Sequence, residues 1–169
     1  MKGSYTVHET RIIDAPIQRV WDAWTQPALM KQWFCPLGMN VADVEADLKV
    51  GGTFRVVMDP GDLDIQRPPG LGKLLVAHGT YRLIYPPETL IFSWSWEGRD
   101  EVSRVSIGLK QIGDQTEVSL LHDGLESEDC RVFHEDGWVP TLDNLSRYVV
   151  ADADVDTSKA TLEAYHETL

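Results

Sequence analysis

Three of the five histidines in this sequence stand where an imidazole could transfer protons. His122 ends the last predicted strand facing inward, and His134 begins the predicted closing helix, so both could lie near one mouth of a cavity. His78, on another predicted strand, could face the same interior. No nucleophile or partner carboxylate stands at a fixed spacing from them, and a histidine at a strand end usually holds a loop by hydrogen bonds. Catalysis by His122 or His134 is therefore one alternative among several.

A second group of residues is suited to binding rather than reaction. Six tryptophans are many for 169 residues, and they suggest a core with room inside it. Alternation along the strands and a helical stripe place several large side chains on one interior surface. Aromatic walls suit a flat or hydrophobic ligand, although such rings also simply fill cores. The candidate ligand-binding residues are Trp33, Phe54, Val56, Met58, His78, Trp94, Trp96, Trp138 and Leu142.

Metal and cofactor sites find no support in the spacing of the residues. The five His and two Cys occur singly, without an HxH, HExxH or CxxC arrangement. Gly70-Leu71-Gly72 precedes a predicted strand, whereas a phosphate-binding loop precedes a helix. We therefore predict no metal and no cofactor.

Charge and cysteine usage restrict the partners and the compartment. A net charge of −12 argues against nucleic acid and against anionic membranes, which both require a basic face. No apolar run at residues 1–10 resembles a signal peptide, and no segment is long enough to cross a bilayer. Cys35 and Cys130 are far apart in the sequence, so we expect two free thiols in a cytoplasmic protein.

The elements that must position these residues begin with a strand over residues 5–13 and two short helices. Ile17, Val20, Trp21 and Trp24 form the apolar stripe of the first helix, and Pro27 begins the second. Both helices are too short to be stable alone, so they must dock on a sheet.

A run of strands follows, and a long helix closes the domain. The expected strands are residues 40–48, 53–58, 74–85, 90–96, 102–111 and 116–122, with an exposed loop at 59–72. The helix spans about 127–150 and buries Trp138, Leu142, Leu145 and Val149. Gly137 and Pro140 predict a kink, or a helix start near Trp138.

The last residues differ in composition from the rest. Residues 1–150 read as one domain, and residues 151–169 as an acidic tail. Leu162, Tyr165 and Leu169 could let the tail form a short docked helix after a linker, and disorder is the alternative.

Four stretches carry a resemblance to a known superfamily. They are Ala15-Pro16 with residues 20–24 and 27–33, Gly79-Thr80-Tyr81 with residues 85–90 and Trp94, residues 116–125, and Gly137-Trp138 with Leu142 and Leu145. In this order they resemble the START/Bet v 1-like (SRPBCC) superfamily, and within it the AHSA1-type domains, named after the activator of Hsp90 ATPase. The resemblance covers roughly residues 5–150. It implies an α+β helix-grip fold, in which a curved antiparallel sheet wraps a long C-terminal helix, often around a hydrophobic cavity.

Three functional hypotheses follow from these residues and from the resemblance. The leading hypothesis is a protein that binds a small hydrophobic molecule between the sheet and the C-terminal helix. The first alternative is a cofactor-independent cyclase or hydrolase that uses His122 or His134, and the second is an Hsp90 co-chaperone-like interaction module. Edge strands and the exposed loop could support a homodimer.

Overall fold

The computed structural model describes residues 5–167 of the chain, and the side chains of residues 5–151. It has the predicted α+β architecture, a seven-stranded antiparallel sheet with two short helices and one long one. In chain order the elements are β1 (Tyr5–Ile13), α1 (Ile17–Thr25), α2 (Pro27–Met30), β2 (Asn40–Ala46), β3 (Thr53–Asp59), β4 (Leu75–Tyr85), β5 (Thr89–Trp96), β6 (Ser103–Ile112), β7 (Gln115–Leu125) and α3 (Glu128–Glu167).

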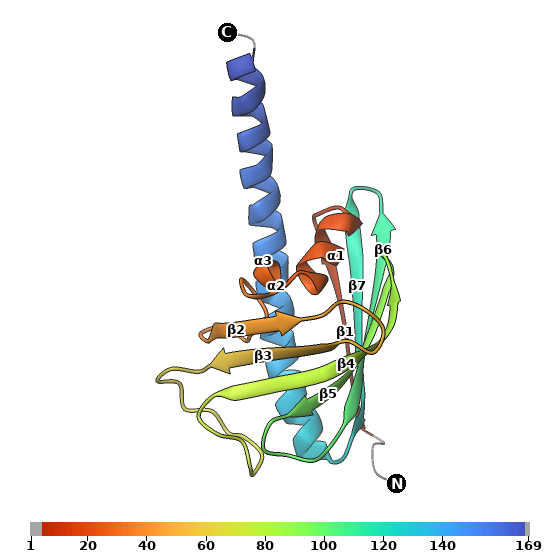
Figure 1. Cartoon of the computed structure of the whole chain (residues 1–169), viewed down its shortest axis with the longest axis vertical. Coiled ribbons are helices and arrows are strands. Elements are labelled where there is room, and N and C mark those ends of the chain that lie inside the picture. The colour runs from red at the N-terminus through yellow and green to blue at the C-terminus, as the bar shows by residue number, and fades with distance from the viewer. Residues whose placement is uncertain (1–4, 168–169) are drawn as a thin grey trace.

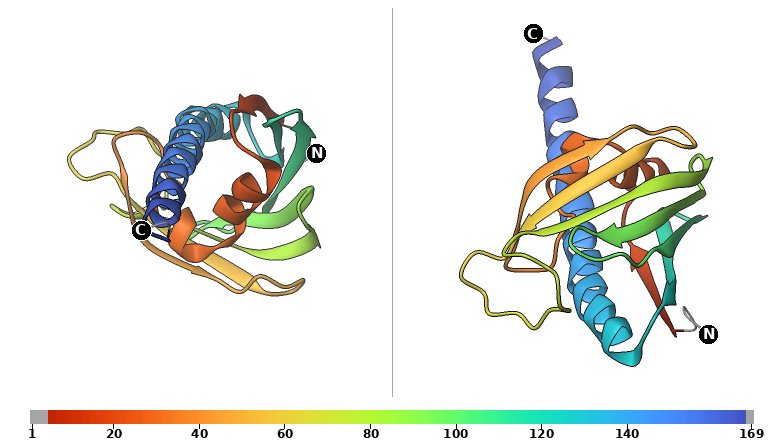
Figure 2. Two further views of the ribbon diagram at one scale, coloured as in Figure 1. Left: turned by 90° about the horizontal axis from the view of Figure 1, so that it is seen from above. Right: turned by 60° about the horizontal axis from the view of Figure 1, so that its bottom comes forward.

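The sheet curves around α3, as Figure 1 and the two views of Figure 2 show. Its strand order is β1-β7-β6-β5-β4-β3-β2. Strands β2 to β7 therefore form a meander, and the last strand, β7, pairs with the first, β1. This register puts His122 of β7 between Val7 of β1 and Val105 of β6. His122 therefore lies on the strand next to the edge of the sheet, with its side chain facing α3.

The short helices dock as their apolar stripe predicts. Val20, Trp21 and Trp24 of α1 are buried, and the Trp24 and Trp33 rings meet edge to face with centroids 4.7 Å apart. The Trp33 indole Nε1 donates a 2.9 Å hydrogen bond to the Ala23 carbonyl, which joins the segment after α2 to α1. Burial against the sheet supplies the stability that two such short helices lack alone.

The long helix α3 begins at Glu128 and continues through Pro140, so the alternative start near Trp138 is wrong. The Ser127 hydroxyl accepts the backbone N–H of Cys130 at 3.1 Å, and Glu128 and Asp129 lie in the first turn, where acidic side chains are favoured. The predicted stripe is buried, as Trp138, Leu142, Leu145 and Val149 are at most 4% exposed.

The tail forms no separate helix after a linker, because α3 is continuous to Glu167. Residues 151–167 contain neither glycine nor proline, so the sequence has no strong helix breaker there. Its end extends beyond the sheet in Figure 1. The predicted packing of Leu162, Tyr165 and Leu169 lies outside the described side chains.

Strand alternation is clearest in β5. Leu90, Phe92, Trp94 and Trp96 are buried, and the intervening residues are partly exposed. Both cysteines are free and buried. No helix in the described part of the chain is long and apolar enough to cross a membrane.

Candidate ligand-binding cavity

A cavity of about 930 Å³ lies between α3, the end of β5 and the loop that joins β3 to β4. That loop, residues 60–74, is called the β3–β4 loop below, and Figure 2 shows it beside the first half of α3. The segment after α2 supplies the remaining wall. The apolar lining residues include Phe34, Met39, Met58, Leu63, Ile65, Leu75, Trp94, Trp96, Phe133 and Trp138.

Three tryptophans form the aromatic wall of the cavity. Trp94 meets Trp96 edge to face, with centroids 5.3 Å apart, and it lies 5.2 Å from Trp138 on α3. Phe34 stacks on Trp94 at 6.2 Å, and Phe133 packs edge to face on Trp96 at 5.9 Å. Sheet and helix therefore contribute to one continuous aromatic surface.

The imidazoles of His122 and His134 each accept a hydrogen bond from one of the tryptophans of this wall. Trp138 Nε1 donates to Nδ1 of His122 at 3.0 Å. Because an indole N–H can only donate, the His122 proton is on Nε2, which lies 2.7 Å from Ser103 Oγ. The Ser103 hydroxyl then donates to the Trp94 carbonyl at 3.3 Å. In this series of hydrogen bonds each group donates to the next, from Trp138 through His122 and Ser103 to the Trp94 carbonyl. The tautomer of His122 therefore follows from its partners.

His134 repeats the arrangement from the helix side. Trp96 Nε1 donates to Nε2 of His134 at 2.9 Å. Nδ1 of His134 lies 2.7 Å from the Cys130 carbonyl, which can only accept, so Nδ1 carries the proton. Both ring nitrogens are therefore occupied by protein partners.

Both histidines are neutral at physiological pH. Burial, together with the neighbouring His134, lowers the pKa of His122 well below its usual value. Burial lowers the pKa of His134 to about 4, although its hydrogen bond to Cys130 acts in the opposite direction. In each neutral imidazole, both ring nitrogens contact protein groups. The two imidazoles therefore position tryptophans, and neither has the free nitrogen that a general acid or base needs.

The structure brings together about half of the predicted site. Met58, Trp94, Trp96, Trp138 and His134 line the cavity. Phe54, Val56, Leu142 and His122 are buried in the core next to it, and Phe54 packs on Phe92 at 5.1 Å instead.

Two predicted placements are wrong. Trp33 does not close the cavity, because its ring packs on Trp24 and its indole bonds to α1. His78 does not face the interior, because it is exposed on β4. Its neighbour Ala77 takes the inward position and is fully buried.

Sequence reasoning missed the walls supplied by irregular segments. Leu63, Ile65 and the prolines of the β3–β4 loop line the cavity, as do Leu37 and Met39 after α2. The sequence signal for this wall was the presence of apolar side chains in a loop that is rich in glycine and proline.

The mouth of the cavity is polar on both sides. Of its charged lining residues, Arg67 of the β3–β4 loop and Arg99 of the turn after β5 are partly exposed, whereas Glu126, Asp129 and Asp136 at the start of α3 are exposed, so these residues mark where the cavity meets solvent. No group of three His, Cys, Asp or Glu in the described part of the chain is arranged to hold a metal ion. Cys130 also lines the cavity, and burial raises the pKa of its thiol, so the nucleophilic thiolate is disfavoured.

Comparison with solved structures finds the same fold in several bacterial proteins. An AHSA1 protein from Silicibacter pomeroyi is 22% identical with a TM-score of 0.73, covering 88% of this chain and 99% of its own. A protein from Chromobacterium violaceum is 22% identical with a TM-score of 0.74, covering 85% and 96%. CalU16 from Micromonospora echinospora is 27% identical with a TM-score of 0.63, covering 96% and 86%.

Comparison with curated proteins gives no match. The match to a protein family is extensive, because residues 14–150 fit the family described as Activator of Hsp90 ATPase homolog 1-like protein. This range includes every residue that lines the cavity. The chain therefore belongs to the AHSA1-like family, within the helix-grip fold of the START/Bet v 1-like proteins.

Proposed function

We propose that this protein binds a small, flat, hydrophobic molecule in the cavity between the sheet and α3. The observation that carries the proposal is the wall of Trp94, Trp96 and Trp138, two of whose indole N–H groups are bonded to core histidines. These two groups are turned to the protein, so the Trp96 and Trp138 rings present apolar surface to the cavity. A volume of about 930 Å³ is at the upper end of the range for small-molecule sites, roughly 300–1,000 Å³.

The lining also favours one orientation of the ligand. Aromatic and aliphatic side chains surround the inner part, whereas Arg67, Asp129 and Asp136 stand at the mouth. A molecule with an apolar body and one polar end would bury the body against the tryptophans and keep the polar end in water. Membership of a ligand-binding superfamily is consistent with this use of the cavity.

The two alternatives have less support. A cyclase or hydrolase that uses His122 or His134 would need a free ring nitrogen, and both imidazoles have both nitrogens occupied. An Hsp90-related role is suggested by the family description alone. Adding the protein to Hsp90 and measuring the ATPase rate tests it, and an unchanged rate would remove it.

Gly137 offers a direct test of the proposed site. It lines the cavity from the first third of α3, and an added Cβ there would meet no neighbouring side chain or other segment within 4 Å. Gly137→Phe should fill the cavity, whereas Gly137→Ala adds one methyl group and leaves the space open. Both changes replace a helical glycine and should favour α3.

The binding assay uses N-phenyl-1-naphthylamine, a neutral aromatic probe whose fluorescence rises in apolar sites. We expect wild type and Gly137→Ala to bind it alike, and Gly137→Phe to bind at least tenfold more weakly. Equal affinity of all three proteins would show that the probe does not occupy this cavity. Native mass spectrometry before and after denaturation then searches for a natural ligand that co-purifies.

A further inference from the structure

Arg99 joins three segments at the mouth of the cavity. It lies in the turn between β5 and β6, and its side chain is 15% exposed. Its NH1 donates to the Pro69 carbonyl of the β3–β4 loop at 2.7 Å. Its NH2 donates to Glu126, just before α3, at 2.8 Å, and it also forms a tight ion pair with Glu101. One guanidinium therefore connects the loop, the turn and the base of α3.

The loop and the turn also touch through two glycines. A Cβ on Gly70 would lie 2.4 Å from the Gly98 carbonyl oxygen, and a Cβ on Gly98 would lie 2.1 Å from that of Gly70. Both glycines have φ near +95°, which disfavours other residues. This contact holds the loop backbone next to Arg99 and requires glycine at both positions.

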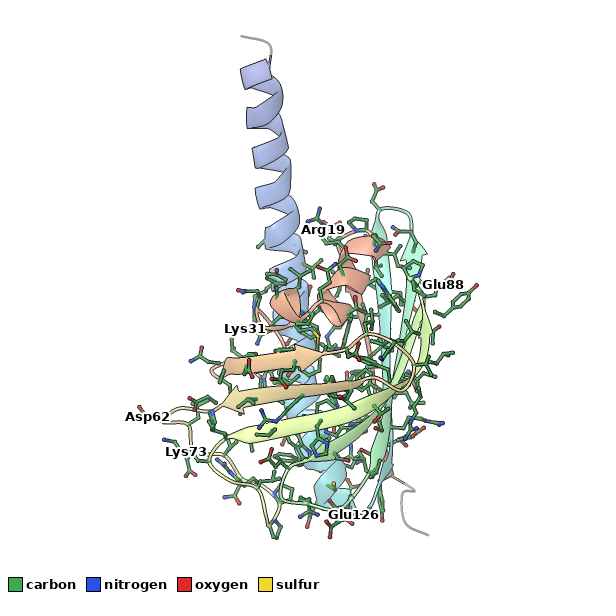
Figure 3. The ribbon with its side chains drawn as sticks, viewed as in Figure 1. Arg19, Lys31, Asp62, Lys73, Glu88 and Glu126 are labelled. Carbon is green, nitrogen blue, oxygen red and sulfur yellow. The ribbon has the colours of Figure 1, made fainter. Side chains whose placement is uncertain are left out.

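The rest of the β3–β4 loop makes few hydrogen bonds to other segments, and Ile65 and Leu71 pack against the core. Its other hydrogen bonds stay within the loop, as with Arg67 to the Gly72 and Lys73 carbonyls, or reach Asp59 at the end of β3. Among the described residues, the bond from Arg99 to Pro69 is the one hydrogen bond that ties residues 60–74 to a distant part of the chain. Figure 3 shows Asp62 and Lys73 on this loop and Glu126 near the base of α3.

The same loop forms one side of the cavity. Leu63, Ile65 and Pro68 line it opposite Phe133 and Asp136 of α3. Moving the loop outward would widen the mouth without disturbing the strands, since no ladder hydrogen bonds are broken. The interactions that such a movement must break are those of Arg99, the glycine contact, and the packing of Ile65 and Leu71 against the core.

We infer that Arg99 is a positioning residue that latches the β3–β4 loop over the cavity, and that ligand exchange requires release of this latch. The inference rests on the proposed binding function, and it adds the route and the residue that controls it. Arginine suits the task because its planar fork serves several acceptors at once. Lysine, a single point charge, cannot serve Pro69, Glu101 and Glu126 together.

The first experiment needs no ligand, so it can fail independently of the binding proposal. Trypsin can cut the loop after Lys73, whereas Arg67 precedes proline and resists cleavage. Cleavage after Lys73 is followed by mass spectrometry in wild type, Arg99→Gln, Arg99→Lys and the control Arg104→Gln. Arg104 pairs with Asp123 on the exposed face of the sheet, at 2.7 Å.

Arg99→Gln should be cut about tenfold faster, the effect of losing one charged hydrogen bond, and the Arg104→Gln rate should equal that of wild type. Arg99→Lys should fall between them. A cleavage rate in Arg99→Gln equal to the control would overturn the latch. Glu126→Gln, which keeps Arg99 in place, is a second and milder test, and it should give a smaller increase.

A kinetic experiment separates a latch from a wall residue. Opening of a latch is needed for both entry and exit, so Arg99→Gln should raise the association and dissociation rates of N-phenyl-1-naphthylamine together. Loss of a wall contact would raise the dissociation rate alone. That second pattern, or unchanged rates, would contradict the inference even if binding in the cavity is confirmed.

Discussion

The imidazole rings of His122 and His134 meet edge to face with their centroids 4.7 Å apart, and each accepts a hydrogen bond from a different tryptophan. His122 belongs to β7 of the sheet and His134 belongs to α3, so the pair joins the two layers beside the aromatic wall. Protonation of either ring would remove an acceptor and place a positive charge in the core. The pair therefore makes the aromatic wall sensitive to acid.

The first prediction concerns stability against pH. The pKa of His134 is about 4 in the folded protein and about 6.5 when unfolded, so the unfolded state binds more protons between these values. The free energy of unfolding is therefore unaffected by the titration of His134 well above pH 6.5, and it falls as the pH drops from 6.5 toward 4. Urea unfolding at pH 7.5 and pH 5 should differ by about 2 kcal/mol from His134 alone, and His122 acts in the same direction.

The control for this prediction is exposed His8. His8→Gln should keep the difference between pH 7.5 and 5, whereas His134→Gln should reduce it by about 2 kcal/mol and leave the part that is due to His122, because glutamine does not titrate. Parallel curves for wild type and His134→Gln would show that this imidazole is not the titrating group.

The second prediction concerns the bond between Trp138 and His122. Replacing His122 with Leu leaves the buried indole N–H of Trp138 without its acceptor, which costs about 1–3 kcal/mol of unfolding free energy. Trp138→Phe in the same background should then cost less than it does in wild type. A double-mutant cycle by urea denaturation measures this coupling, and strictly additive effects would exclude it.

The order of the elements could be predicted from the sequence because alternation and helical periodicity describe regular segments well. The face of β5 and the buried stripe of α3 are confirmed for this reason. The facing of β4 could not be read, because Leu75, Val76 and Ala77 are buried in succession and a bulge follows between Tyr81 and Leu83. Alternation fails in such a strand, so it does not predict that His78 is exposed.

The cavity itself was less predictable than the fold. Its outer wall is a loop whose position depends on Arg99 and on the contact between Gly70 and Gly98. Neither contact follows from a repeating pattern in the sequence. The roles of the histidines depend on distances between residues far apart in the sequence, such as the 3.0 Å from Trp138 to His122. Periodicity cannot supply such information, so catalysis and tryptophan positioning were indistinguishable before the structure.

The third prediction separates cavity residues from exposed ones. Phe133 is half-buried and lines the cavity, so Phe133→Ala should weaken binding of N-phenyl-1-naphthylamine by about tenfold with a modest loss of stability. His78→Ala should leave the affinity unchanged, since His78 is exposed on β4. Fluorescence titration checks both variants, and a loss of binding in His78→Ala alone would reverse the assignment of the site.

The fourth prediction uses the two thiols as reporters of the cavity. Burial raises the pKa of Cys35 to about 11, and its Sγ donates to the Met39 carbonyl at 3.4 Å. Cys130 is also buried, but it lines the cavity and can be reached through the mouth. At pH 7.5 iodoacetamide should therefore modify Cys130 slowly and Cys35 hardly at all before unfolding, because the thiolate is the reactive species.

Bound probe should protect Cys130 by filling the space beside it. Saturating N-phenyl-1-naphthylamine should slow its modification at least fivefold, while urea should expose both thiols equally. Opening of the β3–β4 loop in Arg99→Gln should have the opposite effect and accelerate modification of Cys130 relative to Arg104→Gln. Mass spectrometry of peptides follows each thiol separately. Modification of Cys130 that ignores both the probe and Arg99 would mean that the reagent enters by another route.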